Sequence, residues 1–338
     1  MDFRTLGSFI RDRKEPAYRV KQATQVFSQT FGDSWDSVTA WSKKLREEIA
    51  AIIPWDELTC VDVKESGEGD TVKFLFSCAD GLRIESVIMR HGDGRNTVCV
   101  SSQIGCPMKC GFCATGASGF KRSLTGEEIF DQVIHAARWL KGRGEKVTNV
   151  VYMGMGEPFN NYDEVMRSVR LLNDPDGFGL GARHISISTC GIVPGILKLA
   201  DEPIQVNLAV SLHSAIPETR SRIMPVNKAY PISSLMKSVA TYADKTNRKV
   251  FFEYLLLDGV NDSKKEALAL AKLMETNKRL YHANIIKYND TSSFTATPHD
   301  ARVQFVKWLH EAGVPATHRR TFGDDIDAAC GQLAAKGR

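Results

Sequence analysis

Residues 99–119 read Cys-Val-Ser-Ser-Gln-Ile-Gly-Cys-Pro-Met-Lys-Cys-Gly-Phe-Cys-Ala-Thr-Gly-Ala-Ser-Gly and hold four of the eight cysteines of this 338-residue chain. Cys106, Cys110 and Cys113 follow the spacing C-x3-C-x2-C, and Cys99 lies seven residues before the first of them. Thiolates in a compact loop usually bind a metal, because the loop directs several soft ligands to one point. Three thiolates leave a four-iron cluster one ligand short. The stretch therefore predicts a cluster with one iron open to another ligand.

A structural zinc site is the main alternative for these cysteines. Such a site closes four ligand positions around the ion, so Cys99 would have to join the other three. A zinc-stabilised finger is typical of small domains, whereas a chain of 338 residues can bury a core of its own. We favour the cluster over zinc, and a chance grouping of cysteines ranks third. A zinc-containing RNA-binding protein without enzymatic activity is kept as an alternative function.

The spacing of the three cysteines, followed by small residues, resembles the signature of radical S-adenosylmethionine (SAM) enzymes. In that family a [4Fe-4S] cluster holds SAM through its open iron. A second motif, Val150-Val-Tyr-Met-Gly-Met-Gly-Glu-Pro158, follows the next expected strand. Its glycines let a ligand approach the backbone, and Glu157 offers a carboxylate to a cation. The motif resembles the Gly-Glu pair with which the same enzymes meet the amino group of SAM.

Strands and helices alternate from Thr97 onward. Such alternation indicates parallel strands joined by crossover helices. Thr125-Gly-Glu-Glu has the capping-box pattern before a helix that reaches Leu140. Six such units predict an α/β fold, a partial (β/α)6 radical SAM barrel, with its chemistry at the carboxyl ends of the strands. The expected strands are 97–102, 147–153, 184–189, 205–211, 249–256 and 281–287, with a further one near 315–320.

Two smaller units are expected before this core. Residues 1–62 show helical spacing of apolar residues and form a helical accessory domain, whose basic faces are either solvated or in contact with RNA phosphates. Residues 63–96 alternate with period two around the turn Asp80-Gly81, which predicts a short antiparallel β extension. The radical SAM core with its C-terminal tail then occupies residues 97–338.

Composition restricts the function without deciding it. The net charge of +4 permits a polyanionic partner but does not require one. No apolar run approaches the roughly 20 residues that cross a bilayer, and the first residues lack a secretory signal. The unevenly spread cysteines do not resemble a secreted disulfide framework. We therefore expect a cytoplasmic protein without a membrane partner.

Polar residues follow several expected strands. Ser188 ends the third strand, Ser211 and His213 end the fourth, and Asn289 follows the sixth. Hydroxyls, an imidazole and an amide at one end of a sheet can bind a ribose, a carboxylate or a phosphate, and capping the following helix is the alternative. We favour binding, because these residues fall at the same end of the expected sheet. Cationic side chains near the expected mouth could bind phosphates but are individually more often surface residues: Lys121, Arg122, Arg319 and Arg320. Three further cysteines are expected to pack as small buried residues: Cys60, Cys78 and Cys190.

Several motifs together resemble the RNA adenine methyltransferases of the RlmN/Cfr group. They are the cysteine loop with Cys99 ahead of it, Gly-Met-Gly-Glu-Pro, Ser-Leu-His at 211–213, Pro-Ala-Tyr-Arg-x-Lys-Gln near the start, and the tail Gly323-Asp-Asp-Ile-Asp-Ala-Ala-Cys-Gly-Gln-Leu333. The resemblance covers nearly the whole chain. It implies methylation of one adenine of 23S rRNA near the peptidyl-transferase centre, at C2 in the RlmN branch and at C8 in the Cfr branch. Some RlmN members also act on an adenine beside the tRNA anticodon.

The resemblance also assigns roles to residues. Cys330 becomes the methyl carrier, and Glu85 becomes the general base, although sequence alone favours an exposed strand carboxylate there. Cys106, Cys110 and Cys113 hold the [4Fe-4S] cluster. The residues implied around SAM are Gly156, Glu157, Ser188, Ser211, Leu212, His213 and Asn289.

The chemistry of adenine explains why a thiol carrier is needed. Its C2 and C8 carbons are electrophilic and do not attack the methyl group of SAM, whereas a thiolate does. By the resemblance, Cys330 takes a methyl group from one SAM, a second SAM is cleaved to activate it, and Cys99 attacks the Cys330 sulfur to release the product. Two SAM molecules are consumed, and the resulting disulfide needs a cellular reductant. A low-potential donor of flavodoxin or ferredoxin type is implied, and the enzyme is expected to be monomeric.

The RlmN branch fits this chain better than the Cfr branch, because Gly-Glu-Pro and a substantial N-terminal unit are present. Methylation at C8 remains the nearest alternative, followed by a radical SAM enzyme with another substrate. One departure is visible: Asn289 is followed by Asp290 where family members often have Asn-Pro, so the contact of Asn289 with SAM is the least certain of the set.

Overall fold

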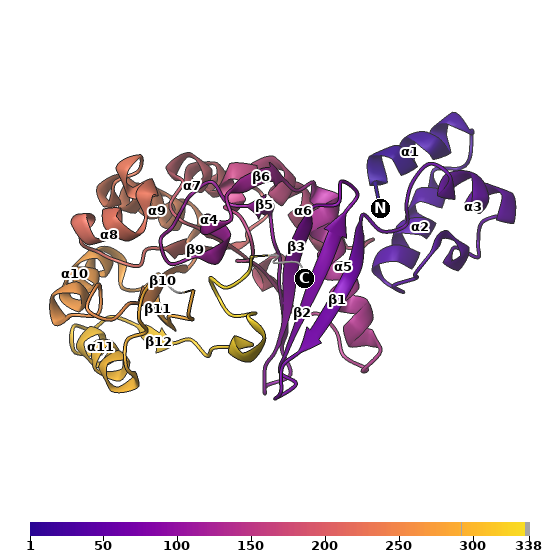
Figure 1. Cartoon of the computed structure of the whole chain (residues 1–338). Helices are drawn as coiled ribbons and strands as arrows, with labels where there is room; N and C mark the ends of the chain where they lie inside the picture. Colours follow the sequence, from indigo (N-terminus) through magenta and orange to yellow (C-terminus); the bar gives the residue numbers. More distant parts are fainter. Residues whose placement is uncertain (292, 335–338) are drawn as a thin grey trace.

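The computed structural model describes residues 1–291 and 293–334. A mixed sheet of ten strands forms its centre (Figure 1). Its strand order is β1-β2-β3-β4-β7-β8-β9-β10-β11-β12. The strands are β1 (Leu58–Glu65), β2 (Thr71–Cys78), β3 (Arg83–Arg90), β4 (Asn96–Cys99), β7 (Asn149–Tyr152), β8 (Ile185–Thr189), β9 (Asn207–Ser211), β10 (Val250–Leu256), β11 (Tyr281–Lys287) and β12 (Ala316–His318). A separate antiparallel pair consists of β5 (Gln103–Gly105) and β6 (Phe120–Ser123).

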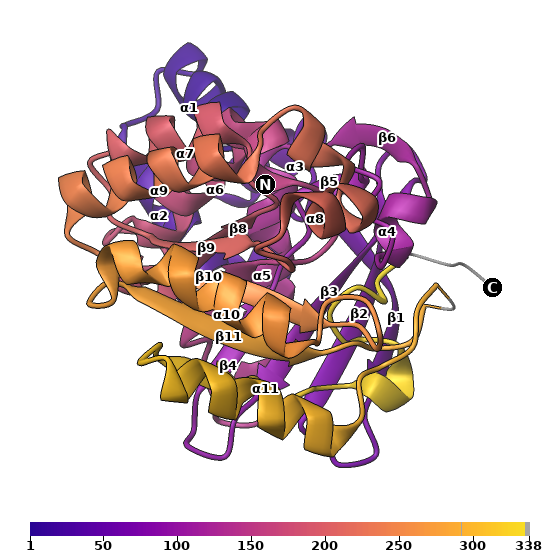
Figure 2. The same ribbon diagram turned by 90° about the vertical axis from the view of Figure 1, so that its left-hand side faces the viewer.

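The expected parallel core is confirmed. Every neighbouring pair from β4 through β12 is parallel. Among the described residues β12 pairs only with β11, so the sheet stays open as a partial barrel. Helices cover its outer side (Figure 2). They are α5 (Gly126–Lys141), α6 (Tyr162–Asn173), α7 (Val193–Ala200), α8 (Pro217–Ile223), α9 (Ile232–Thr246), α10 (Lys264–Met274) and α11 (His299–Glu311), and the loops between them hold the 3-10 turns η2 (Pro158–Asn161), η3 (Ala182–His184), η4 (Pro225–Lys228) and η5 (Glu275–Asn277). The short helix α4 (Ala114–Ala117) follows the cysteine loop, and the 3-10 turn η6 (Asp324–Ile326) lies in the C-terminal segment.

The expected antiparallel extension is also present. Strands β1, β2 and β3 pair antiparallel with one another, and β3 pairs antiparallel with β4, so the extension continues the core sheet. β1 is the outer edge strand and all of it after Leu58 is exposed. Cys60 lies in this edge strand and is exposed, so the expectation that it is buried was wrong; Cys78 and Cys190 are buried as expected. β1 also runs through position 62, and the domain division at 62/63 stays a prediction.

Helix α5 begins with the expected capping box. The Thr125 hydroxyl accepts from the backbone N–H of Glu128 at 3.1 Å, and the Glu128 carboxylate accepts from the N–H of Thr125 at 2.9 Å. Further along α5 the buried Gln132 side chain accepts from the N–H of Ser101 at 2.8 Å and donates to the carbonyl of Ser101 at 2.9 Å. The helix thus satisfies the backbone immediately after β4, where the chain leaves the sheet toward the cysteine loop.

The N-terminal helices form a separate layer beyond α5 and β1 (Figure 1). They are α1 (Phe3–Asp12), α2 (Tyr18–Ser28), η1 (Trp35–Ser37) and α3 (Lys43–Ala50). Phe27 contacts Trp55 and Phe130 of α5 with ring centroids 5.5 and 6.1 Å apart, so aromatic packing joins this layer to the core. No helix among the described residues is long and apolar enough to span a membrane.

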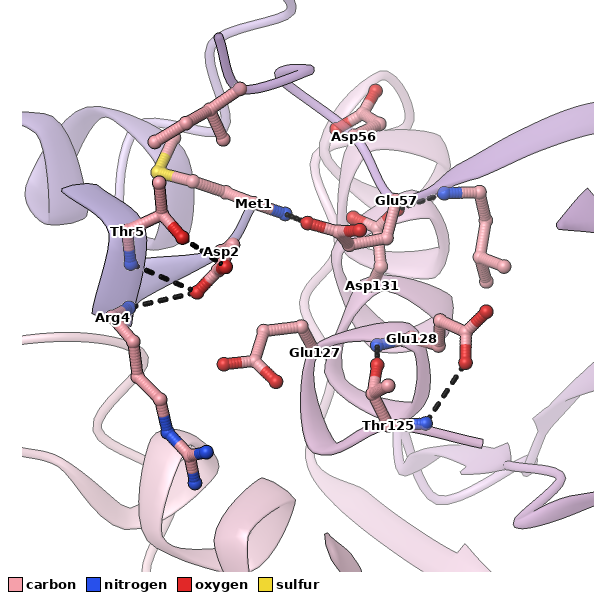
Figure 3. Close-up of polar contacts among 12 residues, drawn as sticks. Met1, Asp2, Arg4, Thr5, Asp56, Glu57, Thr125, Glu127, Glu128 and Asp131 are labelled. Carbon is pink, nitrogen blue, oxygen red and sulfur yellow. Dashed lines mark hydrogen bonds and ion pairs between the residues drawn. The ribbon is translucent and has the colours of Figure 1, made fainter. Parts of the chain in front are cut away.

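A polar network also joins α5 to the segment that leads into β1, and Figure 3 shows Asp56 and Asp131 of this network. The Arg138 guanidinium donates to both oxygens of Asp56 at 2.8 and 2.9 Å. The buried Asp131 carboxylate accepts from the N–H of Leu58 at 2.9 Å, and its Oδ2 lies 3.6 Å from His135 Nε2. Figure 3 shows Asp131 between α5 and the segment that leads into β1. Charged side chains of α5 therefore fix the start of β1.

This network predicts a pH-dependent contribution to stability. Burial alone would lower the pKa of His135, but Asp131 and Asp56 outweigh burial and raise the pKa above its ordinary value of about 6.5. A group with a raised folded pKa stabilises the fold fully below its unfolded pKa and loses that contribution as the pH rises through the folded pKa. For His135→Gln we expect the deficit in melting temperature to be largest at about pH 6 and to shrink toward pH 9, as read by thermal unfolding in matched buffers. The same scan of the exposed His184→Gln controls for loss of an imidazole, and a deficit independent of pH would contradict the assignment.

Candidate active site

The cysteine loop lies at one side of a cavity at the carboxyl ends of the parallel strands. Cys106, Cys110 and Cys113 all line this cavity, which we call the cluster cavity. The loop is anchored by backbone bonds from Gly111 to the carbonyl of Ile223 at 2.9 Å and from Ala114 to the carbonyl of Gly331 at 2.8 Å. The pKa of Cys106 is raised to about 12, chiefly by burial, and the nearby Cys113 contributes in the same direction. Such thiols become ligands only when a metal displaces their protons.

The spacing of the sulfurs distinguishes a cluster from a single zinc ion. Among the described residues, the three loop sulfurs do not all lie within 4.8 Å of one another. Two sulfurs bound to one zinc at about 2.3 Å can be no more than about 4.6 Å apart. Cys99, the fourth ligand that zinc would need, lines a different cavity. The arrangement therefore fits a cluster of several irons better than one zinc ion.

The Gly-Glu motif supplies a fixed carboxylate to the cluster cavity. Glu157 lines the cavity, and its carboxylate accepts from the N–H groups of Phe159 at 3.0 Å and Cys190 at 2.7 Å. Burial raises the pKa of Glu157. At Gly156 φ is +99°, and a Cβ there would lie 2.5 Å from the Gln103 Cβ, so only glycine permits this close packing. A rigid carboxylate of this kind suits the ammonium group of an amino acid.

Three of the polar residues at the ends of the strands lie on the cluster cavity. Ser188, Ser211 and His213 line the cluster cavity. His213 Nδ1 accepts from the N–H of Leu255 at 3.0 Å, while burial and then Arg220 lower its pKa to about 3, so the imidazole is neutral with its proton on Nε2. Leu212 is fully buried and does not line either cavity that Cys330 lines, so its contact with SAM stays a prediction.

Asn289 lies next to the cluster cavity rather than in it. It lines a second cavity, which we call the thiol cavity, and its Nδ2 donates to the carbonyl of Cys330 at 3.2 Å. Its Oδ1 is buried and has no hydrogen-bond partner among the residues that the structure describes. A buried acceptor left without a donor is costly unless a ligand supplies one. The donors of SAM, which are an amino group, an adenine amine and ribose hydroxyls, fit this requirement.

Cys99 and Cys330 come together across the thiol cavity, although 230 residues separate them in the sequence. Cys330 lies in an exposed turn and lines the cluster cavity as well. Cys99 is buried at the end of β4, where burial, followed by the influence of Cys330, raises its pKa to about 12. Cys330 is thus placed between the cluster cavity and Cys99.

Contacts from β2 and α4 hold the C-terminal segment in this position. The Lys73 ammonium donates to the carbonyl of Asp327 at 3.1 Å, and the Thr115 hydroxyl donates to the carbonyl of Leu333 at 2.5 Å. In Figure 1 the yellow segment after β12 runs toward the β1–β3 strands and closes the open side of the partial barrel. The chain end that carries Cys330 is therefore part of the site.

Glu85 does not line the thiol cavity, where Cys99 and Cys330 meet. Its side chain is buried and lines a third, polar cavity instead. The Glu85 carboxylate lies 3.4 Å from Lys73 Nζ and accepts from the N–H of Ala334 at 2.9 Å. The C-terminal segment thus lies between Glu85 and the thiol cavity. The sequence alone favoured an exposed carboxylate here, and that part was wrong.

Sequence reasoning missed Glu253 and named Arg319 only as a cation near the expected mouth. Arg319 lines both cavities and donates to Glu253 at 3.2 Å and to the Met153 sulfur at 3.4 Å, so it does not lie on the outer surface as a phosphate ligand would. Glu253 also lines the cluster cavity. The sequence did contain a signal for Glu253, because it is a lone carboxylate inside the apolar strand Val-Phe-Phe-Glu-Tyr-Leu-Leu. Arg122 and Arg320 are likewise paired with acidic residues, Asp80 and Glu128 for the first and Asp70 for the second.

Comparisons with known proteins agree with this geometry. Residues 100–271 match the Radical SAM superfamily. The chain is 46% identical to the probable dual-specificity RNA methyltransferase RlmN of Staphylococcus haemolyticus over 98% of this chain and 91% of the relative. It is 44% identical to the protein of the same name in Staphylococcus aureus strain Newman, over 99% and 92%. The crystal structure of a radical SAM methyltransferase from Sphaerobacter thermophilus superposes with a TM-score of 0.96 at 42% identity, over 99% and 98% of the two chains.

These findings decide the class of the protein. The superfamily implies a [4Fe-4S] cluster and SAM as cofactors, and the residues around the cluster cavity fit both. The open sheet with its helical N-terminal layer is the fold of the Sphaerobacter enzyme. Because the similarity to the staphylococcal relatives spans nearly the full length, the chain belongs to the RlmN family of radical SAM RNA methyltransferases.

Proposed function

We propose that this enzyme methylates C2 of an adenine in 23S rRNA at the peptidyl-transferase centre, and in addition the adenine beside the anticodon of tRNA. The name of the staphylococcal relatives, a dual-specificity RNA methyltransferase, supports two RNA substrates. The observation that carries the proposal is the meeting of Cys330 and Cys99 across a cavity that adjoins the cluster cavity. Methylation at C8 by the same residues is the second candidate, since the thiol geometry serves both carbons.

Cys330 acts as the methyl carrier in this proposal. Its thiolate attacks the methyl carbon of one SAM, so that a carbon–sulfur bond forms on Cys330, the bond from that carbon to the sulfonium sulfur breaks, and S-adenosylhomocysteine leaves. The cluster and a further SAM, when bound, supply the one-electron chemistry that activates the methyl group. The position of Cys330 at the wall shared by the two cavities lets one sulfur face SAM and then the adenine.

Cys99 acts as the resolving thiol. After the methyl carbon has joined the adenine, the Cys99 thiolate attacks the Cys330 sulfur, the carbon–sulfur bond breaks, and a Cys99–Cys330 disulfide forms. The broken bond leaves its electron pair on the product carbon, which takes up a proton to become the methyl group, and a cellular thiol reductant restores both cysteines. Arg319 lines the thiol cavity with both cysteines and opposes the effect of burial on the pKa of Cys99, which favours the attacking thiolate.

Glu85 acts as the base that removes the proton of the adenine ring. This role requires the contact of its carboxylate with the N–H of Ala334 to break, because the C-terminal segment otherwise separates Glu85 from the thiols. RNA bases that undergo chemistry are taken out of their stack, and a displaced C-terminal segment would leave space for one.

The remaining assignments complete the proposal. Residues 1–62 form the RNA-binding accessory domain, residues 63–96 the β extension and residues 97–338 the core. The enzyme works as a monomer in the cytoplasm and consumes two SAM molecules per methyl group. It receives electrons from a flavodoxin- or ferredoxin-type donor.

Trapping the RNA adduct tests the proposal. Without the resolving thiol, the adenine stays bound to Cys330, so we expect Cys99→Ala, purified without oxygen and incubated with SAM, a reductant and a 23S rRNA fragment, to yield a protein–RNA crosslink. Gel shift under denaturing conditions and mass spectrometry of the nuclease-treated adduct would locate it on Cys330. Cys60→Ala, which removes an exposed cysteine outside both cavities, is the matched control and should give free methylated RNA.

The product of the unmodified enzyme separates the candidates. Nucleoside mass spectrometry should find 2-methyladenosine in both RNAs, and 8-methyladenosine alone would favour the second candidate. Full turnover by Cys99→Ala without any crosslink would contradict the roles given to the two thiols.

A further inference from the structure

One arginine beneath the cluster cavity carries a charge that no carboxylate balances. Arg220 of α8 is completely buried. Its guanidinium donates to the carbonyls of Leu212 at 3.1 Å and Cys190 at 2.6 Å, and to the Asn227 side chain at 3.0 Å. Within the described residues none of its partners is an acidic side chain. Each nitrogen of the Arg220 guanidinium has a hydrogen-bond acceptor, yet the positive charge of the group is not neutralised.

Such an arrangement is unfavourable in the protein alone. Taking a cation out of water is costly unless an anion accompanies it, and buried arginines are therefore usually paired with carboxylates. Burial lowers the pKa of Arg220 to about 10, because it disfavours the charged form of the guanidinium. The groups that oppose this lowering are the thiols of Cys190 and Cys110. The local structure thus lacks an anion on the side of the cysteine loop.

The fold connects Arg220 directly to that loop. The last residue of α8, Ile223, accepts a hydrogen bond from the N–H of Gly111, which lies between Cys110 and Cys113. The Cys190 peptide forms a second connection, because its carbonyl accepts from Arg220 and its N–H donates to Glu157. Arg220 therefore lies behind the wall that the cluster and the Gly-Glu motif share.

We propose that Arg220 is a positioning residue that balances the negative charge of the thiolate-bound cluster and raises its reduction potential. Three thiolates give the loaded loop a net negative charge, and reduction adds one more electron to it. Net charge and hydrogen bonding around a cluster set its potential, so a buried cation nearby stabilises the reduced form. The inference concerns the cluster alone and does not depend on which RNA or which adenine carbon is the substrate.

A neighbouring residue allows the charge to be cancelled without removing Arg220. The Asn227 amide is buried, and its Oδ1 faces the guanidinium at 3.0 Å. Asn227→Asp keeps the shape and places a carboxylate at that oxygen, while the nearby Ser221 hydroxyl can turn to donate to the other one. Arg220→Gln removes the charge directly, and Arg220→Lys keeps it while losing the forked geometry.

The test is a redox titration of the anaerobic holoprotein, followed by electron paramagnetic resonance without RNA. At a fixed solution potential we expect the ratio of reduced to oxidised cluster to fall about tenfold in Asn227→Asp and in Arg220→Gln, equivalent to about 59 mV for a one-electron couple. Arg220→Lys should stay near the unmodified protein. Arg222→Gln removes an exposed charge from the same helix and should leave the potential unchanged.

The outcomes separate charge balance from simple structural support. Should Arg220→Gln fail to fold or to retain iron, Asn227→Asp still reports the effect of the charge. A potential in Asn227→Asp equal to that of the unmodified protein would overturn the inference, whatever Arg220→Gln does. A lowered potential in Asn227→Asp with an unchanged one in Arg222→Gln supports it, even if the enzyme proves to methylate a different base.

Discussion

Replacing Cys110 by alanine is expected to remove the iron–sulfur cluster and with it all methylation, while the chain keeps its fold. Cys110 is one of the three thiols of the C-x3-C-x2-C motif on the cluster cavity, and a cluster that already lacks a fourth protein ligand does not tolerate the loss of another. The loop itself is held by backbone bonds from Gly111 and Ala114 that the substitution leaves in place. Iron and sulfide analysis, the visible absorption of anaerobic protein and circular dichroism would measure the two effects separately.

Cys190→Ala is the matched control for this prediction. Cys190 lines the same cavity and is buried, but it lies outside the C-x3-C-x2-C motif. We expect the control to retain iron and brown colour. If Cys110→Ala kept its full iron content, or if the unmodified protein were colourless and held zinc, the cluster would not be bound by these cysteines.

Local signals in the sequence predicted much of the fold. The Thr125 capping box located the start of α5 because two reciprocal side-chain bonds define a helix end within four residues. The strands of the parallel core were recognisable because each is a short apolar run between turn residues. The three cysteines and the Gly-Glu motif were assigned to one site because both lie in loops that leave the carboxyl ends of strands.

The misses arise from contacts between distant segments. Nothing in the periodicity of β3 shows that Ala334 would reach the Glu85 carboxylate, so the separation of Glu85 from the thiols was not foreseeable. Arg319 was taken for a surface cation, because only the fold brings Glu253 from β10 beside it. Cys330 likewise gains meaning from its position, since a single cysteine near a chain end is usually incidental.

Cys330→Ala is expected to abolish methyl transfer to RNA while cluster content stays normal. Cys99 does not replace the missing carrier, because it is 8% exposed at the end of β4 and burial raises its pKa to about 12, whereas Cys330 lies in an exposed turn on both cavities. A thiol held in a strand with a raised pKa is a poor nucleophile at neutral pH. We expect a loss on the order of 10³-fold or more, as for removal of other covalent catalytic groups.

Transfer of labelled methyl groups from SAM measures this loss in two places at once. The label should appear on Cys330 of the unmodified protein and should be absent from the Cys330→Ala protein. Only the unmodified protein should pass the label on to RNA. Cluster absorbance and SAM affinity are recorded on the same samples, because Cys330 also lines the cluster cavity and its removal must be shown to leave cofactor binding intact. Labelled RNA from Cys330→Ala, above all with label on Cys99, would mean that a buried strand thiol can carry the methyl group, and it would contradict the role given to Cys330.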